Sequence, residues 1–267
     1  MTTILPQAES TARPASDSHT IEIRNVYKSF GSSHILNGLT LDFKDDAITT
    51  VLGPSGTGKS VLLKHIVGLL EPDAGEVRVF GTDIWRVSAE ERFNLRKRFG
   101  VLFQDGALFG SMNLYDNVAF PLRRHTDKSE AEIRDIVMSN LVEVGLETAI
   151  HKAPNEISGG MRKRAGFARA LVMRPDVVLF DEPDSGLDPV RTKLLSQLIA
   201  KVHAEHGGTY IVITHDIPTA RTVSDYVAVI WKGNVVHYGD ADGAFDSDNP
   251  FVRQFLAGAA EGPLGMD

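Results

Sequence analysis

The chain has 267 residues, of which 42% are hydrophobic and 24% are charged. This composition is that of an ordinary globular protein, and the length suffices for a large buried core. The net charge of −7 argues against a broad nucleic-acid-binding surface, because such surfaces are basic. The absence of cysteine excludes disulfides and thiolate metal sites, and it favours a reducing compartment.

The N-terminal segment 1–19 is polar and lacks the apolar core of a secretory signal. We therefore expect a disordered leader over these residues. No apolar run approaches the roughly 18 residues that a membrane-spanning helix needs. The ordered part of the chain is therefore expected to begin near residue 20.

Strands and helices are predicted to alternate after this leader. Ser88 with Glu91, and Ser129 with Glu132, form capping boxes that predict the starts of two helices. Apolar spacing predicts a further helix over 190–202, which ends before the next pair of glycines. Alternating or continuous apolar runs predict strands at 21–26, 39–43, 47–52, 76–80, 99–103, 177–180, 210–213, 226–231 and 235–238.

This order of elements favours an α/β core. The section from about 108 to 174 is mainly helical, and we expect it to form an inserted helical subdomain. The last two strands are predicted to form a hairpin, and a short helix is expected near 251–256.

A glycine-rich loop lies between the apolar run 47–52 and a helical pattern that begins at 61. This is the context of a phosphate-binding P-loop, in which backbone N–H groups and a helix N-terminus face phosphate oxygens. Lys59 would reach the β- and γ-phosphates, and the Ser60 hydroxyl would bind Mg²⁺. The alternative is a flexible surface turn with a lone lysine. The predicted nucleotide-binding residues are Gly53, Pro54, Ser55, Gly56, Thr57, Gly58, Lys59, Ser60 and Val61.

Asp181 and Glu182 follow a buried strand and supply the carboxylates that a P-loop site needs. The strand would bring Asp181 to the carboxyl edge of the sheet, where it would contact Mg²⁺ through its water shell. Glu182 would polarise the attacking water as a general base. The alternative is an acidic turn between a strand and a loop.

A second anion site is predicted where Ser158, Gly159 and Gly160 precede a basic helix. Together with Ile157 and Met161, this segment resembles the signature motif of ABC-transporter ATPases, usually written LSGGQ. The resemblance implies that the motif contacts the γ-phosphate of an ATP held by the other subunit of a head-to-tail dimer. A Ser-Gly-Gly loop that only caps a helix is the alternative.

Four further positions match this family one at a time. Phe30 resembles the aromatic residue that stacks on adenine, and Gln104 the glutamine that touches Mg²⁺ and links to the membrane subunit. Asp188 ends a segment, 185–188, that resembles the D-loop at the dimer interface. His215 resembles the switch histidine that contacts the γ-phosphate. The alternatives are core packing for Phe30, a solvated loop position for Gln104, a helix N-cap for Asp188 and a structural role for His215.

The resemblance covers 21–239 and carries a set of expectations. The fold implied is a P-loop NTPase core of ABC ATPase type, with an antiparallel β subdomain and the helical insertion at 108–174. The ATPase domain would span 20–240, with a C-terminal extension over 241–267. The implied cofactors are ATP and Mg²⁺. The catalytic residues would be Glu182, His215, Lys59 and Gln104, and the metal ligands Ser60, Gln104 and Asp181.

Three positions depart from the family pattern. Ile157 begins the signature in place of leucine, which is a conservative apolar exchange. Met161 ends it in place of glutamine, so an amide hydrogen bond is lost while the backbone anion site is expected to survive. Gly186 replaces the usual alanine of the D-loop, and this exchange is expected to loosen that loop.

Segments 103–122 and 158–165 are similar to ATPases of the Mce/Mla lipid-transport systems, and 181–188 looks most like the actinobacterial Mce branch. The implied partners are a second copy of this chain, an integral membrane permease and, indirectly, lipid-binding proteins with Mce domains. Nucleic acid is not an expected partner. The implied cargo is a sterol, fatty acid or phospholipid. The implied location is peripheral, on the cytoplasmic face of the plasma membrane.

Two surfaces are predicted from this resemblance. An apolar groove for a permease helix would be lined by residues that could equally pack the helical subdomain. The tail 249–256 would contact the opposite subunit or an accessory protein. The groove residues would be Leu108, Phe109, Met112, Leu114 and Tyr115.

Two other functions remain open from the sequence. One is a soluble ABC ATPase that acts on ribosomes or DNA, although such proteins usually carry two fused ATPase domains or a coiled-coil insertion. The other is a regulatory nucleotide-binding module without chemistry, which the glutamate and histidine at 182 and 215 argue against.

Overall fold

The computed structural model describes residues 19–259 and 261–263. The leader predicted over 1–19 therefore lies outside the described residues, except for His19, where the first strand begins. Within the described range, no helix combines the length and the apolar composition needed to cross a bilayer.

The predicted strands and helices are present in the predicted order. Several strands are longer than predicted, and three short elements, at 82–83, 217–223 and 241–245, were not predicted. The strands are β1 His19–Phe30, β2 Ser33–Lys44, β3 Ile48–Leu52, β4 Ala74–Val79, β5 Thr82–Asp83, β6 Phe99–Leu102, β7 Val177–Asp181, β8 Thr209–Ile213, β9 Tyr226–Trp231 and β10 Asn234–Asp240. The helices are α1 Lys59–Ile66, α2 Ala89–Arg96, α3 Leu114–His125, α4 Glu130–Glu143, α5 Gly159–Leu171, α6 Pro189–His206, α7 Ile217–Val223, α8 Ala241–Phe245 and α9 Pro250–Ala257, with a 3-10 turn η1 at Pro154–Glu156.

The larger sheet has the strand order β10-β9-β3-β8-β7-β6 and is parallel except for the β10–β9 hairpin. Alternate residues of its central strands enter two different cores, as the pleat requires. Val178 and Phe180 of β7 pack among residues of α3 to α6. Val177 and Leu179 pack with α1 and with β1 and β2. Because both faces are covered, β3 and β8 are fully buried, which explains their continuous apolar sequences.

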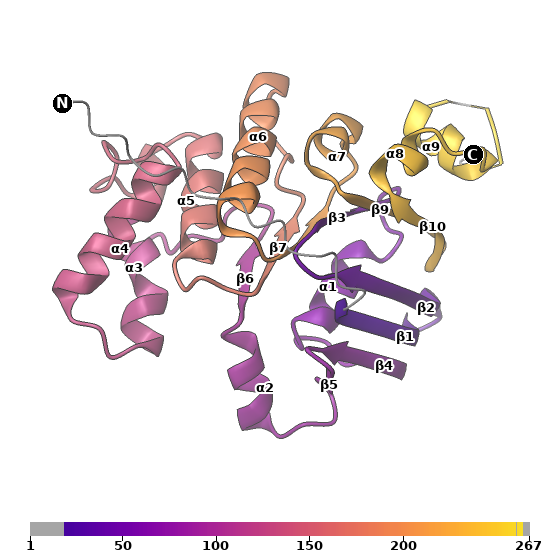
Figure 1. The fold of residues 1–267 in the computed structure, drawn as a ribbon, viewed down its shortest axis with the longest axis horizontal. Helices are drawn as coiled ribbons and strands as arrows, with labels where there is room; N and C mark the ends of the chain where they lie inside the picture. Colours follow the sequence, from indigo (N-terminus) through magenta and orange to yellow (C-terminus); the bar gives the residue numbers. More distant parts are fainter. Residues whose placement is uncertain (1–18, 260, 264–267) are drawn as a thin grey trace, which may run out of the picture.

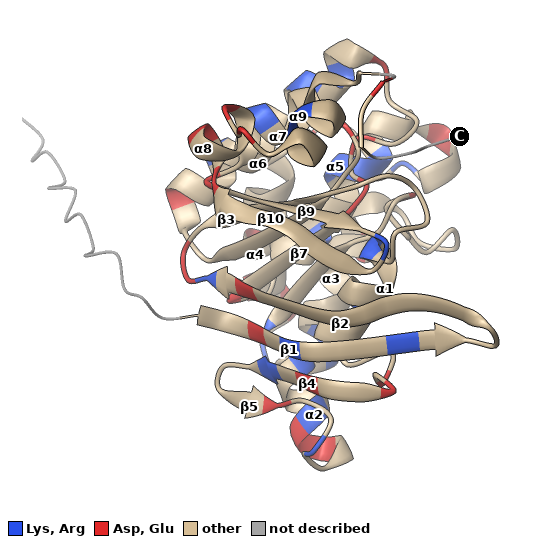
Figure 2. Cartoon of the chain, turned by 90° about the vertical axis from the view of Figure 1, so that its right-hand side faces the viewer, with Lys and Arg blue, Asp and Glu red and all other residues tan. Residues whose placement is uncertain are grey.

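The smaller sheet is antiparallel, with the order β2-β1-β4-β5, and it confirms the predicted antiparallel β subdomain. It lies below the larger sheet in Figure 2, where basic and acidic residues are interspersed along its strands. Arg24 of β1, for example, pairs with Asp42 of β2. This mixed charge gives that face no continuous basic stripe of the kind that binds nucleic acid.

The helices α3, α4 and α5 lie between β6 and β7 in the sequence and gather at one end of the molecule (Figure 1). Both predicted capping boxes are present, at Ser88 before α2 and at Ser129 before α4. On α6, however, Val190 and Leu194 face outward with 69% and 60% of their surface exposed. The apolar spacing therefore predicted this helix correctly, although two of the apolar residues that define the pattern are exposed.

The C-terminal helices α8 and α9 pack beside β9 and β10 (Figure 1). Val252 of α9 is fully buried in a small core with Leu52, Val227 and Val229. Phe255 is partly buried against the same core. These apolar residues of the tail therefore pack on their own chain. The expected contact of 249–256 with the opposite subunit or an accessory protein stays a prediction.

Candidate functional site

The predicted P-loop joins β3 to α1 at the carboxyl edge of the larger sheet. Gly53 has a φ of 154°, and a Cβ there would lie 2.4 Å from the carbonyl oxygen of Ile230. Gly58, the N-cap of α1, has a left-handed φ of 98°. Only glycine meets both demands without strain, so the two positions fix the tight curl of the loop. Ser55 and Gly56 at its tip are exposed, and Val61 packs toward the core behind it.

Lys59 lies within the curl of the P-loop. Its ammonium donates hydrogen bonds to the carbonyl oxygens of Gly53 and Pro54, at 2.7 Å and 2.9 Å. Burial lowers the pKa of Lys59, and the nearby carboxylates of Glu182 and Asp181 oppose that shift. A buried cation held near two carboxylates at a helix N-terminus is a suitable receptor for phosphate.

Ser60 and Asp181 lie together at the start of α1 and the end of β7. The Ser60 hydroxyl donates a hydrogen bond of 3.1 Å to Asp181 Oδ1. Burial raises the pKa of the Asp181 carboxyl, and the Ser60 hydrogen bond lowers it in part. Two adjacent oxygen ligands, one in a partly desolvated carboxylate, fit a hard divalent cation such as Mg²⁺.

Glu182 and His215 face each other across the neighbouring loops. The Glu182 carboxylate lies 3.6 Å from His215 Nδ1, and about half of the His215 side chain is exposed. Glu182 has a left-handed φ of 48°, which is unusual for a residue with a side chain. The predicted base and the predicted switch histidine are therefore adjacent, and the backbone at the base is strained.

Gln104 lies in the loop after β6, with its side chain directed to the predicted D-loop. Its amide Nε2 donates a hydrogen bond of 2.9 Å to Ser185 Oγ. Among the described residues, no hydrogen bond joins Gln104 to Ser60 or Asp181. The structure thus brings Ser60 and Asp181 together and places Gln104 against the D-loop.

The predicted signature residues Ser158, Gly159 and Gly160 lie at the start of α5. Ser158 caps the helix, since its hydroxyl accepts a hydrogen bond of 3.3 Å from the Met161 N–H. Met161 is partly buried against the helical core, so the exchange of glutamine for methionine leaves the helix start in place. The helix start that the predicted anion site requires is therefore present, with Ser158 exposed and the two glycines half-buried.

Asp188 caps the start of α6, as the helix-capping alternative predicted. Its carboxylate accepts a hydrogen bond of 3.0 Å from the Arg191 N–H and lies 3.2 Å from Arg191 Nε. About half of the Asp188 side chain remains exposed. The capping role therefore leaves part of the carboxylate free to meet a second molecule.

Phe30 ends β1 and is half exposed, which leaves its ring open for stacking. The end of β1 is held by Asp73. The Asp73 carboxylate accepts hydrogen bonds from Lys28 Nζ and from the Ser29 N–H, both at 2.7 Å. These contacts lower the pKa of the Asp73 carboxyl, the Lys28 hydrogen bond most of all.

We expect Asp73→Asn to lower the melting temperature at pH 7, and the difference from wild type to shrink on acidification. The folded-state pKa of Asp73 lies below its unfolded value. Its stabilising contribution is therefore complete above about pH 4 and is lost as the pH falls through the folded pKa. Thermal unfolding of both proteins from pH 7 to pH 3 measures this. A difference that stays constant or grows in acid would contradict the assignment.

A half-buried arginine of α5 holds the loop that carries Gln104. Arg169 donates hydrogen bonds to the carbonyl oxygens of Ala107 and Gly106, at 2.9 Å and 3.0 Å. Burial lowers the pKa of this guanidinium. The sequence marks α5 only as a basic helix, and its spacing does not tell which of the cations are buried.

Four of the five residues predicted to line the permease groove separate into two groups, and the fifth, Met112, is half-buried. Leu114 is fully buried, and Leu108 and Tyr115 are partly buried against the same core, so these three pack the helical part. Phe109 is 42% exposed, with its ring centroid 4.9 Å from that of Phe120. The prediction was therefore wrong for Leu114, while Phe109 belongs to an exposed aromatic pair.

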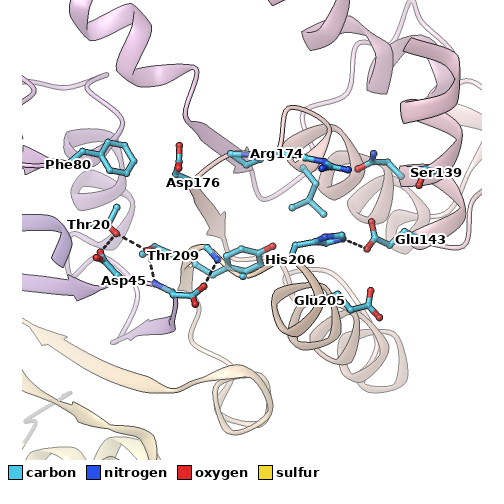
Figure 3. Close-up of a pocket in the computed structure, with 17 residues that line it drawn as sticks. Thr20, Asp45, Phe80, Ser139, Glu143, Arg174, Asp176, Glu205, His206 and Thr209 are labelled. Atoms are coloured by element: carbon cyan, nitrogen blue, oxygen red, sulfur yellow. Dashed lines mark hydrogen bonds and ion pairs between the residues drawn. The ribbon is translucent and has the colours of Figure 1, made fainter. Parts of the chain in front are cut away.

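A separate cavity of about 670 Å³ lies at the opposite, amino-terminal ends of the central strands. Figure 3 shows Thr209 and Asp176 on one side of it, with His206 bonded to Glu143. The His206 Nε2–Glu143 Oε1 distance is 2.7 Å, which joins α6 to α4. This cavity lies at the end of the larger sheet opposite the P-loop edge. Residues of α4, α5 and β8 are among those that line it.

Comparison with known sequences identifies the family. The model of the ABC transporter family matches residues 36–185. The chain is 56% identical over 246 residues to the probable ribonucleotide transport ATP-binding protein mkl of Mycobacterium leprae, with 92% of this chain and 71% of that protein covered. It is 41% identical over 244 residues to the intermembrane phospholipid transport system ATP-binding protein MlaF of Haemophilus influenzae, with 91% and 92% covered.

Solved structures agree with this result. The structure of cbiO1 from Clostridium perfringens, part of the ABC transporter complex cbiONQ, has a TM-score of 0.79 and 30% identity, covering 86% of this chain and 92% of that chain. The dimeric post-hydrolysis structure of the cassette MJ0796 with ADP and phosphate has a TM-score of 0.76 and 30% identity, covering 82% and 98%. The chain therefore belongs to the ABC transporter family, as an ATP-binding subunit with ATPase activity.

Proposed function

We propose that two copies of this chain close head to tail around two ATP molecules, and that this closure drives a membrane permease that moves lipid. Each nucleotide is held by Lys59 and Ser60 of one copy and by Ser158 and Gly160 of the other. The closure shifts the permease because the two permease states bind the open and closed dimers with different affinities.

Within one P-loop half, different residues have different roles in ATP hydrolysis. Ser60, Asp181 and Gln104 would hold Mg²⁺, which neutralises phosphate charge when it is bound. Glu182 polarises the attacking water, and His215 contacts the γ-phosphate. The remaining nucleotide contacts are Phe30 on adenine, the backbone of 53–61 on the phosphates, and Asp188 and Gly159 at the dimer interface.

The separation of the P-loop and the signature within one chain supports the shared site. Over the part of the chain that the structure describes, no hydrogen bond joins residues 53–60 to residues 157–161. The helices that follow these two motifs, α1 and α5, lie apart in Figure 1. The similar cassette MJ0796 is itself described as a dimer. This separation is what a nucleotide site shared between two copies requires.

Exposed aromatic residues support docking to a permease. Phe93, Phe103, Phe109 and Phe120 are between 37% and 47% exposed and come from α2, α3 and the loop after β6. Exposed aromatic residues of this kind are typical of sites that receive an amphipathic helix. We place the ATPase at the cytoplasmic face of the plasma membrane, where it would meet such a permease.

Two groups of relatives suggest different cargo. The mycobacterial relatives carry the name of a ribonucleotide transporter, whereas the MlaF relatives carry that of a phospholipid transporter. The MlaF match extends over more than nine-tenths of both chains, and the likeness of 158–165 to lipid-transport ATPases points the same way. We therefore favour phospholipid or another lipid as the cargo.

Reconstitution tests this choice. The chain would be purified in detergent with the permease that co-elutes and placed in vesicles that contain a fluorescent phospholipid. We expect lipid transfer to acceptor vesicles that requires ATP and disappears in a complex with Glu182→Gln. ATP-dependent uptake of a labelled ribonucleotide, with lipid transfer no greater than in the Glu182→Gln complex, would refute lipid as the cargo. Nucleic-acid-stimulated ATPase without a co-eluting permease would favour a soluble ABC ATPase.

A further inference from the structure

Lys163 is a buried cation on α5 that the mechanism above does not use. It is 5% exposed and lies one turn after the start of the signature helix. Its ammonium donates hydrogen bonds to the carbonyl oxygens of Glu182, at 3.3 Å, and of Ser185. Burial lowers its pKa, and the carboxylates of Asp184, Asp105 and Glu182 oppose that shift. The buried ammonium group of Lys163 therefore binds two backbone carbonyls in place of water.

The first of these carbonyls belongs to the strained residue of the site. Glu182 holds a left-handed φ of 48°, and its N–H donates a hydrogen bond of 2.8 Å to the carbonyl of Ile213 in β8. Lys163 binds the carbonyl on the other side of the same residue. A strained residue persists only when its surroundings fix it. Here the Ile213 and Lys163 contacts do so, together with a hydrogen bond of 3.2 Å from the Ser185 N–H to the same Glu182 carbonyl. They thereby direct the Glu182 side chain toward His215.

The second carbonyl belongs to the D-loop. Ser185 is held twice, since Lys163 binds its carbonyl and Gln104 donates to its hydroxyl. Lys163 therefore joins α5 to the predicted base and to the residue that Gln104 contacts. Since α5 is a continuous helix from Gly159 onward, a displacement of its N-terminus moves Lys163 with it.

We propose that Lys163 is a positioning residue that couples the signature of each chain to Glu182 of the same chain. When the signature engages the ATP held by the second copy, α5 carries Lys163 to a position that aligns the catalytic carboxylate of its own site. The two nucleotide sites of the dimer are thereby linked. This inference rests on the proposed function.

Lys163→Met tests the proposal, because methionine keeps the length of the side chain and removes the donor. We expect kcat for ATP hydrolysis to fall at least roughly tenfold with KM changed less than about threefold, since orientation and not binding is lost. Lys163→Gln, whose amide can still donate, should recover most of kcat. The Hill coefficient for ATP should fall toward one in Lys163→Met, because the link between the sites is removed.

Arg164→Met is the matched control. Arg164 is the next residue of α5, and its guanidinium also binds two backbone carbonyls, those of Val144 at 2.7 Å and Gly145 at 3.1 Å. These carbonyls lie in the helical part, away from Glu182. We expect this variant to lose thermal stability to a similar degree as Lys163→Met while its kcat stays within about threefold of wild type.

Equal losses of kcat in the two methionine variants would overturn the proposal, as would wild-type kcat and Hill coefficient in Lys163→Met. If instead the proposed function is wrong, Glu182→Gln itself should turn over ATP like wild type. If Glu182→Gln is inactive and Lys163→Met is fully active, the coupling through Lys163 is rejected while the proposed function stands.

Discussion

Replacing Glu182 by glutamine is expected to reduce ATP turnover at least about 100-fold while ATP binding stays within about threefold of wild type. The amide has nearly the shape of the carboxylate, so the strained backbone and its contacts to Lys163 and Ile213 are retained. What is lost is the charge that polarises the attacking water. With hydrolysis blocked, the protein should accumulate as an ATP-bound dimer.

Phosphate release and nucleotide binding by the purified chain measure the two effects separately. Light scattering with and without ATP measures the dimer. Glu205→Gln, at an exposed position on α6, is the control for removing a carboxylate and should hydrolyse ATP like wild type. Wild-type turnover in Glu182→Gln would remove Glu182 from the role of base and would favour a module without chemistry at this position.

The second large effect is expected at the signature. Aspartate caps a helix as well as serine does, so Ser158→Asp should keep the cap that now accepts from Met161. Its carboxylate, however, would face the γ-phosphate of the ATP on the second copy and repel it. We expect ATP binding by the single chain within about threefold of wild type and a loss of turnover of at least about 100-fold.

Ser158→Asn separates charge from shape, because asparagine also caps the helix but carries no charge. It should retain clearly more turnover than Ser158→Asp. Lys59→Ala gives the contrasting phenotype, since it removes the cation from the P-loop half and should weaken ATP binding itself. If Ser158→Asp weakened ATP binding as much as Lys59→Ala, the signature would belong to the same half of the site as the P-loop, against our proposal.

The sequence was sufficient for every part of the site that depends on local spacing. The run from β3 through the P-loop into α1 and the strand that ends at Asp181 were predicted because neighbouring residues determine them. The contact of Ser60 with Asp181 then follows from the topology, since parallel strands bring their carboxyl ends to the same edge.

Contacts between distant segments could not be predicted in this way. Lys163 and Arg169 lie in one basic helix with Arg162. Only the packing of α5 against the loops after β6 and β7 decides that Lys163 is buried and that Arg169 binds backbone carbonyls. Leu114 and Phe109 look equally suited to a groove in the sequence. Helix α3 packs Leu114 into the helical core, whereas Phe109, in the loop before α3, stays 42% exposed beside Phe120.

Cross-linking between chains tests the shared nucleotide site most directly. Because the chain contains no cysteine, Ser55→Cys in the P-loop and Ser158→Cys in the signature introduce unique thiols, both at exposed positions. Each substitution would be placed in a separate Glu182→Gln chain, the two chains would carry tags of different size, and the mixture would be treated with a short bis-maleimide. We predict a covalent heterodimer that forms only with ATP and Mg²⁺. The absence of a heterodimer while ATP and Mg²⁺ are bound, or a heterodimer that forms equally well without them, would contradict the account.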